Sequence, residues 1–106
     1  MRRRRRRLKM ASLTPMARQL WPLCYRGEPF PKGWRVEWAG FMRGALGLTL
    51  YSERRILLSY GDRKKRNPIR TLAHEFVHVR TNGKLRHGKE FSDLVERNIR
   101  LMWGLS

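Results

Sequence analysis

Residues 67–83 read NPIRTLAHEFVHVRTNG, and this stretch carries the signals of one amphipathic helix with defined ends. Asn67 and Pro68 predict an N-cap and a first turn, because an asparagine side chain can accept a free helix N–H and proline suits the first helical position. Asn82 and Gly83 predict the end, because both residues readily adopt the left-handed conformation found after a helix C-terminus. Apolar residues recur at helical spacing along one face: Ile69, Leu72, Phe76 and Val79. We therefore expect a helix through this stretch whose apolar face packs on a sheet.

The opposite face of this helix carries His74, Glu75 and His78, in the pattern HExxH. Positions i and i+4 lie on one helix face, so His74 and His78 can bring two imidazoles to one cation. Glu75 lies about 100° around the helix axis from His74, so it flanks the metal without binding it and can act as a base towards water there. A catalytic zinc needs a third protein ligand, and His87, nine residues after His78, is the remaining histidine. Alternative oxygen ligands follow in the sequence: Glu90, Asp93 and Glu96.

A first helix is expected between residues 13 and 24. Its apolar residues recur at helical spacing: Leu13, Met16, Ala17, Leu20, Trp21 and Cys24. Thr14 and Pro15 predict the N-cap and first turn, and Pro22 predicts a stop or a kink. Cys24 lies on the apolar stripe, which indicates a small buried side chain and not a reactive thiol.

Three segments alternate between apolar and polar or small residues, as half-buried strands do. They cover residues 34–38, 46–51 and 55–59, and the short polar turn between the last two predicts a hairpin. Trp34 and Trp38 occupy alternate positions of the first strand, which favours core packing; stacking platforms for bases are the alternative. Another helix is expected from near Gly88, with one apolar stripe: Phe91, Leu94, Val95, Ile99 and Met102. The sequence thus predicts one α+β domain over residues 11–106, with an N-terminal helix, a three-stranded mainly antiparallel sheet, the HExxH helix and a C-terminal helix.

The formal net charge of the chain is +17 in 106 residues. Residues 1–10 supply seven of these charges and nothing to bury, so we expect a disordered arginine-rich tail there, and the remaining residues still carry +10. Such a balance favours polyanionic partners, DNA or RNA first, gripped by the tail or by the basic cluster at residues 63–66. No individual residue is assigned to nucleic-acid contact. The chain has one cysteine and no apolar run long enough for a membrane span, so we expect a cytoplasmic or, in a eukaryote, nuclear protein that is not secreted.

The two histidine segments, HEFVH at 74–78 and HGKEF at 87–91, together resemble the SprT-like (Spartan-type) zinc metalloproteases. Strand-like segments at 34–36 (WRV), 47–49 (GLT) and 55–59 (RILLS) also resemble those that precede the active-site helix in that family. The similarity spans roughly residues 12–103 and is specific only in its histidine motif. Many family members carry a cysteine-rich zinc ribbon after the protease domain, and this sequence has none.

The resemblance implies a minimal zincin-like domain with Zn²⁺ held by His74, His78 and His87 and with Glu75 as the catalytic base. It implies a metallopeptidase that hydrolyses peptide bonds in protein or peptide substrates associated with nucleic acid. Tyr51 or Tyr60 could stabilise an oxyanion beside the metal, although an ordinary strand-edge tyrosine is the favoured interpretation of each. The alternative function is a non-enzymatic nucleic-acid-binding module stabilised by zinc, which would not need the base.

Overall fold

The computed structural model describes residues 12–40, 42, 44–59 and 68–104. Its helices and strands are α1 (Thr14–Cys24), β1 (Arg35–Trp38), β2 (Gly47–Leu50), β3 (Arg55–Leu58), α3 (Pro68–Thr81) and α4 (Lys89–Gly104). The expected α+β class and element order are confirmed. The predictions for the tail at residues 1–10, the cluster at residues 63–66, Tyr60 and the N-cap Asn67 lie outside the described residues.

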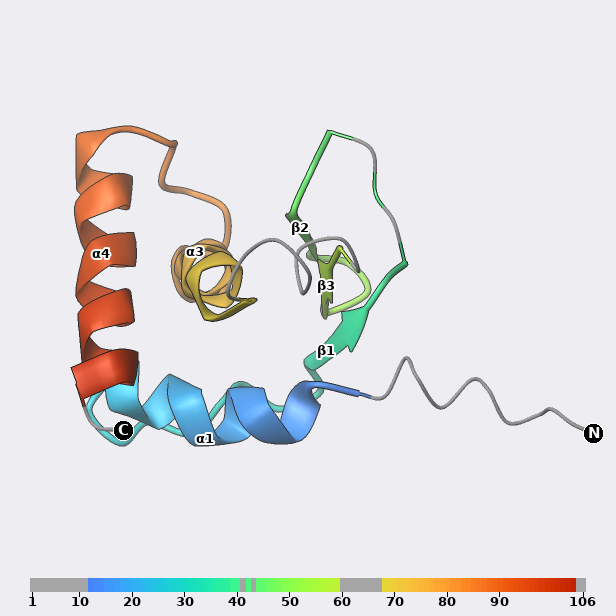
Figure 1. Ribbon diagram of the computed structural model, residues 1–106, viewed down its shortest axis with the longest axis horizontal. Helices are drawn as coiled ribbons and strands as arrows, with labels where there is room; N and C mark the ends of the chain where they lie inside the picture. The colour runs from blue at the N-terminus through green and yellow to red at the C-terminus, as the bar shows by residue number, and fades with distance from the viewer. Residues whose placement is uncertain (1–11, 41, 43, 60–67, 105–106) are drawn as a thin grey trace, which may run out of the picture.

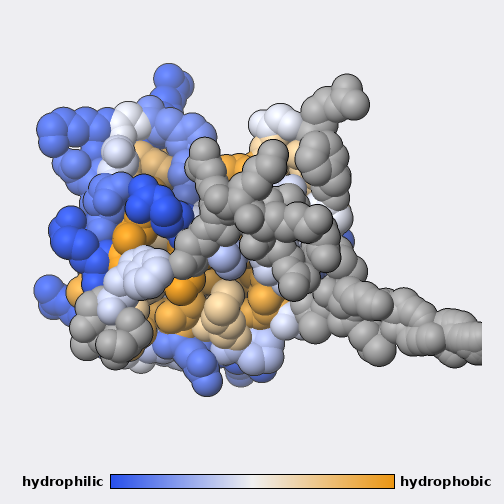
Figure 2. Space-filling model, in the orientation of Figure 1, coloured by the Kyte–Doolittle hydropathy of each residue, from blue (hydrophilic) through white to orange (hydrophobic). Residues whose placement is uncertain are grey.

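The elements form layers around the central helix α3 (Figure 1). The sheet lies on one side of α3 and α4 on the other, while α1 crosses beneath them and contacts both α4 and β1. The outer surface of α4 is hydrophilic, and hydrophobic residues show between α4 and the sheet, where α3 lies (Figure 2). The central helix α3 therefore packs against α4 on one side and against the sheet on the other.

The sheet is mixed, with strand order β1-β3-β2. The predicted hairpin is present, because β2 and β3 pair antiparallel. By contrast, β1 pairs parallel with β3, with Val36 opposite Ile56. β1 and β2 follow each other in the sequence but are not neighbours in the sheet, because β3 lies between them. This leaves β2 at the edge of the sheet beside α3.

The hydrophobic core is formed by residues of α1, the sheet and α4 that pack against α3. Leu72 and Phe76 of α3 are fully buried, and the Trp21 ring of α1 meets the Phe76 ring edge-on at a centroid distance of 5.0 Å. Cys24 is buried as predicted, and burial raises the pKa of its thiol to about 11. Trp34 and Trp38 are partly buried against this core, which agrees with the packing role preferred from the sequence.

The start of α1 differs from the sequence prediction. Leu13, and not Thr14, is the N-cap residue, and no side chain caps the helix there. The Thr14 hydroxyl instead accepts the Val36 backbone N–H at 3.0 Å, which ties the helix start to β1. Pro22 lies inside the helix, which ends two residues later. Proline at this position removes the helical hydrogen bond to the Arg18 carbonyl and crowds that carbonyl.

The described part of the chain contains no helix with both the length and the hydropathy that a membrane crossing requires.

Candidate metal centre

The three histidines of the chain converge at one end of α3. The ring nitrogens that could bind a metal, one from each of His74, His78 and His87, all lie within 4.8 Å of one another. The Nε2 atoms of His78 and His87 are 3.0 Å apart. Nitrogens bound tetrahedrally to zinc at about 2.1 Å are separated by roughly 3.4 Å, so small ring rotations bring this set to the required spacing. Histidine, cysteine, aspartate and glutamate side chains can all bind metals. Among those of the described residues, the three histidines are the group that lies close enough together to share one ion.

A single aromatic ring supports all three imidazoles. The Phe91 ring lies 4.8 Å from that of His74 and 4.7 Å from those of His78 and His87, centroid to centroid. Phe91 is only 3% exposed, and it sits in the first turns of α4, one helical turn beyond His87. The buried Phe91 therefore gives the three rings a common packing surface.

The turn after α3 returns the chain to the histidines, as the sequence predicted. Asn82 and Gly83 have φ values of 54° and 73°, in the left-handed region. The Gly83 N–H donates to the His78 carbonyl at 2.9 Å, which ends the helix. The chain then reverses, so His87 is positioned before the start of α4 and opposite His78.

Burial keeps two of the imidazoles neutral. The pKa of His74 is lowered mainly by burial and then by the charge of His87. Burial, followed by the charges of His74 and His87, lowers the pKa of His78 to about 4. A histidine must be unprotonated to bind a metal, so at neutral pH both side chains are in the ligand form. Neutral imidazoles suit zinc and other borderline transition metals, and the donor set therefore fits the cation that the sequence motif predicts.

Glu75 lies beside the cluster and is 4% exposed. Its Oε1 accepts a hydrogen bond from the Thr49 hydroxyl of β2 at 2.6 Å. Burial raises the pKa of Glu75 to about 7, and the Thr49 hydrogen bond partly opposes that rise. A carboxyl group with this pKa can both accept and release a proton near neutral pH.

The edge strand β2 presents its small and polar residues to α3. A Cβ atom on Gly47 would lie 2.8 Å from Glu75 Oε2 and 2.6 Å from a methyl carbon of Thr71, so a larger residue would have to displace one of these side chains. Leu46 and Leu48 consequently remain 37% and 44% exposed. Sequence reasoning did not identify Gly47 or Thr49 as site residues, although the single hydroxyl within a leucine-rich strand was a usable signal.

Two pockets border the histidines. One, of about 330 Å³, is lined by residues of the edge strand and of both helices: Ala45, Leu46, Gly47, Arg70, Thr71, His74, Glu75, Val95 and Ile99. The second, of about 210 Å³, is lined by His74, His87, Gly88, Phe91, Ser92 and Val95. His74 belongs to both pockets, so a group bound in the first lies next to the histidine cluster and to Glu75.

The alternative oxygen ligands lie outside the cluster. Asp93 pairs with Lys89 at 2.9 Å, Glu96 pairs with Arg70 at 3.5 Å, and Glu90 is exposed at the start of α4. Tyr51 follows β2, and its hydroxyl lies beside Gly83, where a Cβ atom would be 3.0 Å away. The pKa of Tyr51 is raised by burial and then by the charge of Glu75, but no hydrogen bond joins the two residues.

Comparison with family models, with curated proteins and with solved structures found no match for this chain.

Proposed function

We propose that this protein is a zinc-dependent metallopeptidase whose substrates are proteins associated with nucleic acid. The observation that carries the proposal is the convergence of the three histidine nitrogens within 4.8 Å beside a buried glutamate that immediately follows one of them. His74, His78 and His87 would hold the ion, which supplies a Lewis acid that polarises the scissile carbonyl and lowers the pKa of water.

Glu75 performs the proton transfers. Thr49 holds Oε1, and the missing side chain at Gly47 leaves Oε2 the room to face the pocket. The carboxylate takes a proton from the attacking water and delivers it to the leaving amine. The likeness to SprT-like proteases, carried by the two histidine segments, supports this assignment.

The edge strand supplies a binding surface for an extended peptide. β2 pairs with β3 on one side only and borders the pocket that contains Glu75. A substrate strand that adds to this edge would form main-chain hydrogen bonds along β2 and pass its scissile bond in front of the histidines. Association with nucleic acid is proposed from the net charge of +17.

The test is cleavage of a basic protein substrate, with and without single-stranded DNA, alongside measurement of zinc content. Glu75→Gln preserves the shape of the side chain but cannot accept a proton, so it should abolish cleavage while one zinc per chain is retained. Glu90→Gln is the matched control, because it makes the same change at an exposed position of α4, and it should cleave normally. Undiminished cleavage by the Glu75 variant would exclude it as the base. Zinc binding without cleavage by the unaltered protein would favour the non-enzymatic alternative.

A further inference from the structure

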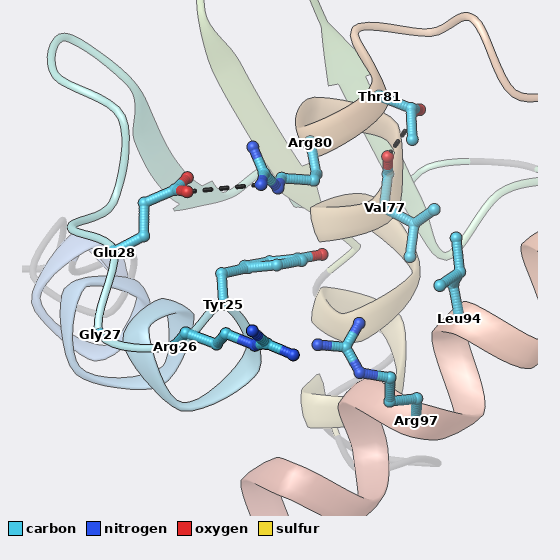
Figure 3. A pocket seen from close by; sticks show the side chains of 9 residues that line it. All are labelled: Tyr25, Arg26, Gly27, Glu28, Val77, Arg80, Thr81, Leu94 and Arg97. Carbon is cyan, nitrogen blue, oxygen red and sulfur yellow. Dashed lines mark hydrogen bonds and ion pairs between the residues drawn. The ribbon is translucent and has the colours of Figure 1, made fainter.

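Another cavity, separate from the histidine pockets, collects three arginine side chains. Its volume is about 580 Å³, and it shares no lining residue with either pocket beside the histidines. It lies where the end of α1 meets α3 and α4 (Figure 3). The lining residues of this arginine pocket are Tyr25, Arg26, Gly27, Glu28, Val77, Arg80, Thr81, Leu94 and Arg97.

The charges of the arginine pocket are unbalanced. Arg80 forms an ion pair with Glu28, at 3.4 Å, and Glu28 is the one carboxylate in the lining. Arg97 donates to the neutral backbone carbonyl of Cys24 at 2.7 Å, and within the described part of the chain neither Arg97 nor Arg26 has a carboxylate partner. Figure 3 shows these two side chains directed towards each other. Two convergent guanidinium groups repel one another, and an anion between them would reverse that repulsion.

The backbone holds Arg26 at this position against its conformational preference. Its φ is 53°, in the left-handed region where glycine is favoured, and Gly27 follows with a φ of 81°. The Gly27 N–H donates to the Pro22 carbonyl at 2.8 Å, which fixes the turn. Left-handed residues are common just after a helix C-terminus, and here this turn places the Arg26 side chain at the pocket.

Tyr25 orients the other two guanidinium groups. The Cζ atoms of Arg80 and Arg97 lie 5.3 and 5.9 Å from the centre of its ring, within the range of cation–π contact. The Tyr25 hydroxyl in turn accepts a hydrogen bond from Asn98 Nδ2 at 3.0 Å, and Asn98 is fully buried. The arginines are therefore arranged before any ligand arrives, which reduces the entropy lost on binding.

We propose that the arginine pocket binds a phosphate group. Planar guanidinium groups match the oxygens of a phosphate by paired hydrogen bonds, and they do so better than lysines. The phosphate could be free or part of a nucleic-acid backbone, for which the overall charge of the chain gives a long-range attraction. This binding does not depend on the histidine cluster, and it stands whether or not the chain is a peptidase.

The test compares two arginine-to-glycine variants. Arg26→Gly removes one pocket charge and relieves a left-handed backbone, so the variant should fold at least as well as the unaltered protein. Arg54→Gly is the matched control, because Arg54 also has a left-handed φ, 54°, but lies exposed in the turn between β2 and β3. Each protein is titrated with inorganic phosphate and, separately, with a single-stranded oligonucleotide at constant ionic strength, and binding is followed by backbone amide NMR.

With inorganic phosphate we expect saturable shifts at Gly27 and Thr81, with Gly88 beside the histidines unaffected. Arg26→Gly should weaken this binding at least tenfold, roughly the loss that accompanies removal of one hydrogen bond to a charged group, and Arg54→Gly should leave it unchanged. Equal weakening of oligonucleotide binding by Arg26→Gly identifies the ligand as a backbone phosphate, and weakening of inorganic phosphate alone identifies a free phosphate. Equal effects of the two variants, or no saturable shift at Gly27 and Thr81, would overturn the proposal.

Discussion

Replacement of Glu75 by glutamine should make the zinc-free protein more resistant to unfolding at alkaline pH. Burial raises the pKa of this carboxyl from 4.5 to about 7, so the folded state binds a proton more tightly than the unfolded chain does. The stabilisation that follows is fully present below pH 4.5 and is lost as the pH rises through 7. A shift of this size corresponds to about 3.4 kcal/mol in the free energy of unfolding, of which roughly 2.5 kcal/mol falls between pH 5 and pH 8.

Glutamine cannot ionise, so Glu75→Gln lacks this loss. Its Oε1 can still accept the Thr49 hydroxyl, whereas its amide N–H groups need acceptors that the carboxylate did not, and their absence would cost about 1–3 kcal/mol at every pH. The informative quantity is therefore the change between pH 5 and pH 8 in the stability difference between variant and unaltered protein. We expect that change to be about 2.5 kcal/mol in favour of the variant.

The assay is urea unfolding followed by tryptophan fluorescence, after treatment with a chelator. Titrations that the two proteins share cancel in the comparison. Glu90→Gln, at an exposed position, should follow the pH profile of the unaltered protein. With zinc present the difference should shrink, because a nearby cation favours the ionised carboxylate and lowers its pKa. Parallel pH profiles for Glu75→Gln and the unaltered zinc-free protein would refute the raised pKa and the burial argument behind it.

The remaining predictions concern the metal, the strand contact and the tail. His74→Ala should reduce zinc content from one ion per chain to nearly none by elemental analysis, and full retention would contradict the ligand assignment. His87→Ala should weaken zinc binding in a chelator competition far more than Glu90→Ala, and the reverse order would indicate a carboxylate ligand. Gly47→Ala should lower the free energy of unfolding by about 1–3 kcal/mol, since the added carbon would lie 2.6 Å from its nearest neighbour; an unchanged urea midpoint would show that strand and helix can separate freely. Deletion of residues 2–7 should flatten the salt dependence of single-stranded DNA affinity by up to ~4 in the log–log slope, and an identical slope would show that the tail does not contact phosphates.

The central helix could be predicted from sequence because its signals are local. Pro68, Asn82 and Gly83 act through their own backbone preferences, and the spacing of His74 and His78 follows from helix geometry alone. The approach of His87 to the other two histidines was likewise foreseeable, since an Asn-Gly turn directly after the helix reverses the chain towards it. The role of these side chains as zinc ligands stays a prediction.

Other features depend on contacts between distant segments. The parallel pairing of β1 with β3 is decided by which strand fills the middle of the sheet, and alternation within one strand carries no information on that choice. The same alternation could not show that Gly47 and Thr49, and not the leucines beside them, face the helix. That orientation arises because α3 comes close to β2 at position 47.

The proximity of His78 and His87 has a consequence for the stability of the folded chain. Their Nε2 atoms are 3.0 Å apart across a nine-residue separation, and the chain has a single cysteine and so cannot form a disulfide within itself. A cation that bridges the two histidines would act as a reversible cross-link, closing a loop of about ten residues. Unlike a disulfide, such a link does not persist in the unfolded chain, so the free energy of metal binding adds to the stability of the folded state and rises with the metal concentration. Chelation would then lower the free energy of unfolding, while α4 stays packed on α3 through buried residues such as Ile99 and Met102.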